Sequence, residues 1–194
     1  MRASAAAQFL FLDTRDKILK FINFISLSLL LSVAASGCLP VPGAGGQAQT
    51  LSINDVAPEL ASATALNPFT EGVSVTYKTF NIEQVDAFSQ SSAKLLGMVM
   101  VAEKMREVAA NFGEGLDVGS FNDATALGEG ALAFARRVVE QAQALQTQGQ
   151  ELLGNISSIA ASEPLKIPAI TAEVTDSLSR ITDALSRATS IVGG

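Results

Sequence analysis

A heptad-spaced run of small and apolar residues between positions 124 and 159 constrains the fold of this chain more than any other feature. The run alternates steps of three and four residues over five heptads, through Ala124, Gly128, Ala131, Ala135, Val138, Ala142, Leu145, Gly149, Leu152, Ile156 and Ile159. This spacing places all of the side chains along one side of an α-helix. About half of them are glycine or alanine, so a neighbouring helix can approach closely. The pattern predicts a long helix, opened by a capping pattern at Ser120 and Asp123.

Two further segments have a helical pattern. The first begins at Asn81, which forms a capping-box pattern with Gln84, and its apolar stripe comprises Phe88, Ser91, Leu95, Leu96, Met98, Val99, Ala102, Met105, Ala109 and Phe112. The second begins near Pro168, with Thr, Asp, Ser and Arg expected on its outer face and an apolar seam of Val174, Leu178, Ile181, Leu185, Ala188 and Val192. Glycines near 113 and prolines near 164 separate the three segments. Short connections between long helices require antiparallel neighbours, so we expect an all-α fold, an antiparallel up-down-up bundle of three long helices.

The segment before these helices is less regular. Asn54 and Asp55 are placed to cap a short extra N-terminal helix that contains Pro58 and extends to Leu66. The alternation over residues 72–77 is typical of an extended segment, and we expect it to pack along the helices because no partner strand is evident. Residues 51–194 are therefore interpreted as a single helical-bundle domain. Residues 38–50 are rich in proline and glycine and are interpreted as a flexible tether.

The N-terminal segment ends at the only cysteine of the chain. Lys17 and Lys20 precede an apolar run over residues 21–36, which is shorter than the roughly 20 residues that a membrane-spanning helix needs. The run closes with Ala35-Ser36-Gly37-Cys38, which resembles the lipobox of bacterial lipoproteins. The resemblance covers only this first part of the chain. It implies a signal peptide over residues 1–37 and acylation of Cys38, which would anchor the protein stably in a lipid bilayer through more than one acyl chain. In lipoproteins of enterobacterial type, Asp after the cysteine marks inner-membrane retention, so Leu39 favours the outer membrane.

Composition excludes several functional classes. Residues 38–194 carry 17 acidic and nine basic side chains, hence a net charge of −8, and an acidic surface repels the phosphate backbone of nucleic acids. The chain has no histidine, and its one thiol is the expected acylation site. Zinc sites, Ser-His-Asp triads and Cys-His pairs are excluded on this ground. We predict no catalytic, cofactor or metal site.

Three motifs suggest chemistry, but each is better explained by helix packing or solvation. Ser91-Ser92-Ala93-Lys94 matches the Ser-x-x-Lys of penicillin-recognising enzymes, whose other motifs are missing from the chain. The run from Gly128 to Ala133 matches Gly-x-Gly-x-x-Ala but lies inside the predicted long helix, whereas a dinucleotide site needs a preceding strand. Glu103 and Glu107 are interpreted as a solvated charged face. Met98, Met100 and Met105 are interpreted as core residues.

Two functions remain. The preferred hypothesis is a membrane-anchored bacterial envelope lipoprotein with a non-enzymatic structural or protein-interaction role. Its partners would be the lipid bilayer, through acylated Cys38, and a protein partner or a second copy bound through helix faces. The alternative is a carrier or sensor of lipid or other apolar small ligands, with a Met- and Phe-lined interior.

Overall fold

The computed structural model describes residues 45–61, 68–69, 72–113, 118, 121 and 123–194. The predicted signal peptide, Cys38 and the first part of the predicted tether lie outside these residues. None of the helices in the described ranges is long and apolar enough to cross a membrane.

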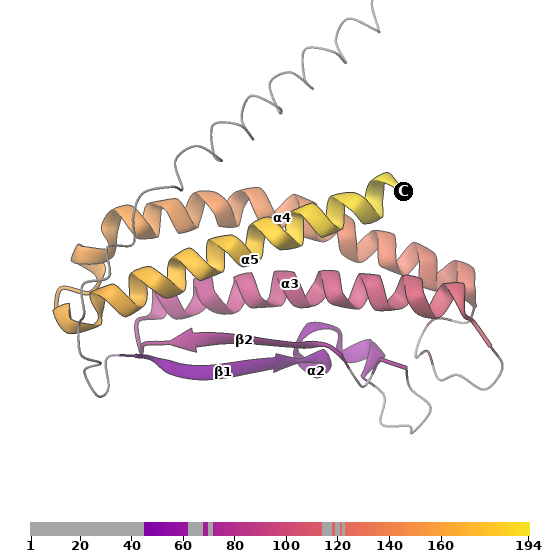
Figure 1. Ribbon diagram of the computed structural model, residues 1–194, viewed down its shortest axis with the longest axis horizontal. Coiled ribbons are helices and arrows are strands. Elements are labelled where there is room, and N and C mark those ends of the chain that lie inside the picture. The colour runs from indigo at the N-terminus through magenta and orange to yellow at the C-terminus, as the bar shows by residue number, and fades with distance from the viewer. Residues whose placement is uncertain (1–44, 62–67, 70–71, 114–117, 119–120, 122) are drawn as a thin grey trace, which may run out of the picture. The chain divides into compact units, whose positions relative to one another are not determined.

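Three long helices dominate the fold and confirm the predicted up-down-up bundle (Figure 1). They are α3 (Glu83–Ala110), α4 (Ala124–Ile159) and α5 (Ile167–Gly193), and each packs against the other two. Asp123 is the N-cap of α4, since its Oδ1 accepts a hydrogen bond of 2.8 Å from the backbone N–H of Ala126. The helix therefore begins three residues later than the predicted capping pattern, which had Ser120 as the cap and Asp123 inside the helix; Ser120 lies outside the described residues. A short 3-10 helix, Pro164–Lys166, leads into α5.

A two-stranded antiparallel sheet, which the sequence analysis did not predict, lies along α3. Strand β1 (Gln47–Ser52) pairs with β2 (Ser74–Thr79), and Leu51 stands opposite Val75 and Gln49 opposite Tyr77. The expectation that the extended segment lacks a partner strand is therefore wrong. The predicted tether is also too long, because its residues 47–50 belong to β1. The strand pattern of β1 was missed because four of its six residues are exposed and polar or small.

The sheet, α3 and the pair α4–α5 form three layers, with α3 in the middle (Figure 1). Val75 and Tyr77 of β2 are buried on the α3 side. Because α3 is covered on both sides, its buried residues are not confined to one stripe, and they include Val85, Ser89, Ser92 and Ala93 as well as most of the predicted stripe. Four members of that stripe are not buried: Ser91, Leu96 and Ala109 are half-buried, and Phe112 is 40% exposed.

Between the strands, the chain forms the short helix α2 (Ile53–Val56) and the 3-10 helix η1 (Pro58–Leu60). Two helix caps that the sequence analysis predicted are wrong: Asn54 and Asp55 for the N-terminal helix, and Asn81 for α3. Ser52 caps α2, and Asp55 in its first turn accepts hydrogen bonds from the N–H and Oγ of Ser52, at 2.7 and 2.8 Å. Asn81 has a φ of 61°, a left-handed conformation that asparagine tolerates, and Ile82 is the residue before α3. The predicted end of the N-terminal helix, at Leu66, lies outside the described residues.

The small-residue seam of α4 allows close packing, as predicted, but not at every position. A Cβ atom at Gly149 would lie 2.6 Å from both Leu178 Cδ2 and Phe88 Cζ, so α4 approaches α3 and α5 closely there. Ala131, Ala135 and Ala142 are fully buried. By contrast, a Cβ atom at Gly128 would meet nothing within 4 Å. The close approach therefore depends on which way a small residue of α4 faces, and it is not a property of every position in the seam.

Candidate functional site

The predicted lipidation residue, Cys38, lies outside the described residues, so its acylation stays a prediction. The structure describes the other motif residues and places them in helices. Ser91 is half-buried and Lys94 is exposed, and no hydrogen bond links these two described residues. The Gly-x-Gly-x-x-Ala run starts at Gly128, inside α4, rather than between a strand and a helix. No group of three or more His, Cys, Asp or Glu residues in the described ranges is placed to hold a metal ion.

The methionines of α3 occupy the core, as predicted. Met105 is fully buried, Met98 is 6% exposed, and Met100 packs against the core from a half-buried position. The interpretation of Glu103 as part of a solvated face is incomplete, because Glu103 forms an ion pair with Arg187 of α5. Glu107 pairs with Lys104 of its own helix at 3.0 Å and is 63% exposed, as the prediction stated.

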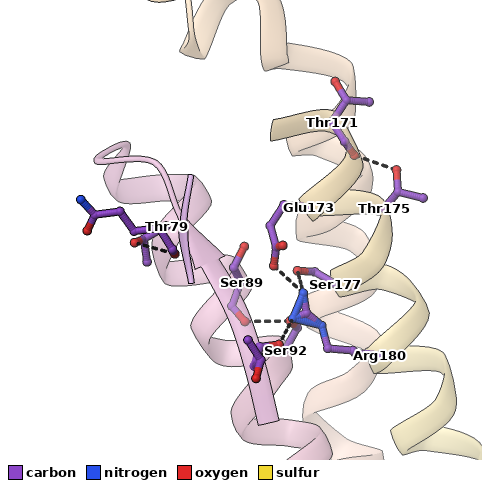
Figure 2. Close-up of polar contacts among 10 residues, drawn as sticks. Thr79, Ser89, Ser92, Thr171, Glu173, Thr175, Ser177 and Arg180 are labelled. Atoms are coloured by element: carbon purple, nitrogen blue, oxygen red, sulfur yellow. Dashed lines mark hydrogen bonds and ion pairs between the residues drawn. The ribbon is translucent and has the colours of Figure 1, made fainter. Parts of the chain in front are cut away.

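A buried polar cluster on α5 is the first candidate site that the sequence analysis missed. It consists of Glu173, Ser177 and Arg180, which follow one another at turn spacing on the inner side of the helix (Figure 2). The Arg180 guanidinium forms an ion pair with Glu173, which is only 4% exposed, and its Nη2 donates to Ser177 Oγ at 3.3 Å. The prediction that Ser and Arg side chains occupy the outer face of this helix is therefore wrong at Ser177, which is fully buried.

The same cluster connects α5 to the outer edge of β2. Arg180 Nη1 donates to the backbone carbonyl of Thr76 at 3.4 Å. Further along the edge, Lys166 Nζ donates to the carbonyl of Phe80 at 3.3 Å, and the N–H of Phe80 donates to Asp86 Oδ1 at 2.7 Å. Charged side chains thus satisfy backbone groups that would otherwise be left without a strand partner. The cluster therefore adds a polar contact between α5 and the sheet, which also packs on α3.

A shallow depression of about 300 Å³ lies over this junction. Its lining is mostly polar or charged and consists of Thr76, Tyr77, Lys78, Glu173, Asp176, Ser179 and Arg180. Burial, followed by the nearby Asp55 and Asp86 carboxylates, raises the pKa of Tyr77 above its ordinary value. The depression carries charges of both signs, and Arg180 already binds Glu173 and Thr76. This arrangement fits a structural junction better than a site for a charged ligand.

A second polar junction joins α3 and α5. Arg187 binds Glu103 through two nitrogens, with Nε at 2.8 Å from Oε1, and its Nη1 lies 3.2 Å from Asp183 Oδ2. The hydrogen bonds to Glu103 raise the pKa of Arg187, despite partial desolvation, so the guanidinium stays charged. A depression of about 330 Å³ lies beside this pair and is lined by Glu103, Arg106, Arg187, Ser190 and Ile191.

The two junctions have a common sequence origin. Residues 175–181 and 182–188 form a seven-residue repeat that places Arg180 and Arg187 at equivalent positions. A strict period of seven keeps both arginines on nearly the same side of the helix. The sequence analysis assigned the polar residues of this helix to its outer face, and that assignment is wrong at Ser177 and Arg180.

Comparison with known protein families, with characterised proteins and with solved structures found no significant match to this chain.

Proposed function

We propose that the protein is a bacterial envelope lipoprotein, anchored through acylated Cys38, whose helical domain has a structural or protein-contact role. The observation that carries this proposal is the small-residue run Ala35-Ser36-Gly37 before the sole cysteine. Strand β1 begins at Gln47, nine residues after Cys38. A fully extended chain of this length spans about 30 Å, so the domain would stay close to the bilayer.

The exposed surface of α4 supports a contact role. From Gln141 to Ser162 the chain carries a single charged side chain, Glu151. Several polar, uncharged residues are exposed along this stretch, among them Gln141, Gln143, Thr147, Gln148 and Gln150. The central parts of protein interfaces are depleted in charged residues, and this uncharged stretch shares that property.

The alternative, a carrier of lipid or another apolar ligand, receives less support. Such a site needs a space lined mainly by apolar side chains. Both depressions described above are lined mainly by polar and charged residues, and Met98 and Met105 are packed in the core. An apolar molecule that co-purifies with the protein in stoichiometric amount would favour the carrier.

The anchoring proposal is tested by labelling cells that express the full chain with a palmitate analogue. Wild type should take up the label and remain in the membrane fraction, and Cys38→Ser should lose both. Ala35→Leu is the matched control, because leucine is usual at this position of a lipobox and should leave labelling intact. A wild-type protein that is bound to the membrane without label would contradict the proposal.

A further inference from the structure

The free edge of β1 can be identified from the contacts on the opposite edge of the sheet. The carbonyl of Thr76 points away from β1, because it accepts a hydrogen bond from Arg180 of α5. In an antiparallel pair, a residue whose backbone groups point outward stands opposite a residue whose groups point outward on the other side. Thr76 is opposite Thr50, so the N–H and C=O of Thr50 lie on the free edge. The alternation along the strand places those of Ala48 and Ser52 there as well.

One of these outward groups already has a partner. The N–H of Ser52 donates to Asp55 Oδ2 at 2.7 Å, which confirms the assignment of the outward positions and closes that end of the edge. Ala48 and Thr50 are exposed, and their outward backbone groups have no partner among the residues that the structure describes. The unpaired part of the edge is therefore short and lies over residues 48–50.

The two edges of the sheet differ in protection. Natural edge strands are usually protected by charged side chains, proline or a covering element. Arg180 and Lys166 protect the edge of β2 in this way. Strand β1, with the sequence Gln-Ala-Gln-Thr-Leu-Ser, contains neither a charge nor a proline. Gln49 faces the same side of the sheet as Tyr77, but Gln49 is exposed whereas Tyr77 is 8% exposed, so the outer strand extends beyond the cover that α3 provides.

We infer that β1 pairs with β1 of a second copy of this chain, antiparallel and about a two-fold axis at Gln49. In this register Ala48 of one copy stands opposite Thr50 of the other, and the two symmetric pairs exchange about four backbone hydrogen bonds. The strands form one four-stranded sheet, β2-β1-β1-β2. The two Gln49 side chains stand directly opposite each other, close enough for their amides to hydrogen-bond.

A second copy fits this edge better than a charged partner does. Strand β1 has no charged side chain, so no like charges stand opposite each other between the two paired strands, and the isologous contact satisfies the same backbone groups on both copies. The inference names a second copy as a partner in the contact role proposed above, through β1 rather than through the surface of α4, and to that extent it rests on the proposed function. Confinement to one membrane surface would raise the effective concentration of the two copies.

A cross-link tests the register directly. Gln49→Cys in the full chain, oxidised in the membrane by copper-phenanthroline and air, should yield a disulfide-linked species of doubled mass on a non-reducing gel. Opposite residues at a position that is not hydrogen-bonded lie about 4.5 Å apart between Cα atoms, within the range that a disulfide spans. Thr189→Cys, at an exposed position near the end of α5 and outside the uncharged surface of α4, and the wild type should stay unlinked. Equal linking of Gln49→Cys and Thr189→Cys would overturn the register.

Charge variants at the same position test the dimer in solution. Sedimentation of the full chain in detergent should show a wild-type dimer, and Gln49→Lys or Gln49→Glu should each weaken it several-fold, because like charges then stand opposite each other. An equimolar mixture of the two variants should dimerise again. Thr50→Pro, which removes one outward N–H from each copy, should weaken the dimer about tenfold. Circular dichroism confirms that each variant keeps the wild-type helical spectrum.

A monomeric wild type, or Gln49 variants that dimerise like the wild type, would overturn the inference. Its failure is distinguishable from failure of the anchoring proposal. An acylated monomer contradicts only the pairing of β1, and a dimer without acyl label contradicts only the lipoprotein assignment.

Discussion

Gly149 offers the sharpest test of how closely the helices pack, because two opposing effects of one methyl group can be compared. In the middle of a helix, replacing glycine by alanine stabilises by about 1 kcal/mol through helix propensity. At Gly149, however, the new Cβ atom would lie 2.6 Å from Phe88 Cζ and from Leu178 Cδ2. Leu178 is half-buried and its Cδ2 is the end of a flexible side chain, but Phe88 is a rigid ring that is fully buried in the core.

Overpacking of this kind typically costs 1–3 kcal/mol, which outweighs the gain from propensity. We therefore expect Gly149→Ala to destabilise by a net amount of about 1 kcal/mol. For a domain of this size, such a change lowers the melting temperature by about 2–4 °C. The matched control is Gly154→Ala, on the same helix, where a Cβ atom would meet nothing within 4 Å. This control should be stabilised by up to about 1 kcal/mol.

The measurement is thermal and urea unfolding of the full chain, followed by circular dichroism at the helical band. The decisive quantity is the difference between the two variants, about 2 kcal/mol, since the contribution of helix propensity is the same in both. If Gly149→Ala were stabilised as much as Gly154→Ala, the helices would not approach closely at this point, and the explanation of the small-residue seam would be refuted.

Three further perturbations test other parts of the structure. Ala142→Leu adds atoms at a fully buried position of α4 and should destabilise by about 1–3 kcal/mol, seen as a lower urea midpoint; an unchanged midpoint would mean that the position is not enclosed. Arg180→Met leaves the Glu173 carboxylate buried without its cation and should cost about 3 kcal/mol, whereas adding Glu173→Gln should recover much of the loss; the double variant tests whether the pair acts as a unit. The hydrogen bonds from Ser52 lower the pKa of Asp55 below the ordinary 3.8, so their stabilisation is present at neutral pH and is lost as the pH falls through the lowered value. Asp55→Asn should therefore be less stable than wild type at pH 7, and the two urea midpoints should converge in strong acid; a constant difference would contradict this role.

The long helices could be predicted from sequence because each contains a stripe of the correct period. In α4, Ala131, Val138, Ala142 and Leu152 follow a 3-4 spacing that only a helix places on one side, and all are buried. The break at Pro164 and the start of α4 are also local signals, since a missing N–H and a side-chain acceptor act within one turn, although the cap is Asp123 and not Ser120 as the pattern predicted. Interactions that lie within a few residues of one another are the ones that a single sequence shows directly.

The sheet and the two polar junctions were decided only by tertiary structure. Strand β1 is exposed over Gln47–Thr50, and its partner lies some 25 residues away in the chain, so neither periodicity nor a turn signal marked the pairing. The inward orientation of Ser177 and Arg180 has a similar cause, because it depends on β2 providing the Thr76 carbonyl and on Glu173 providing the opposite charge. Local sequence determined where the chain forms helices, since that depends on side chains a turn apart. Contacts between distant segments decided which groups pair with the exposed backbone atoms and with the buried charged side chains. A local sequence pattern does not show such contacts.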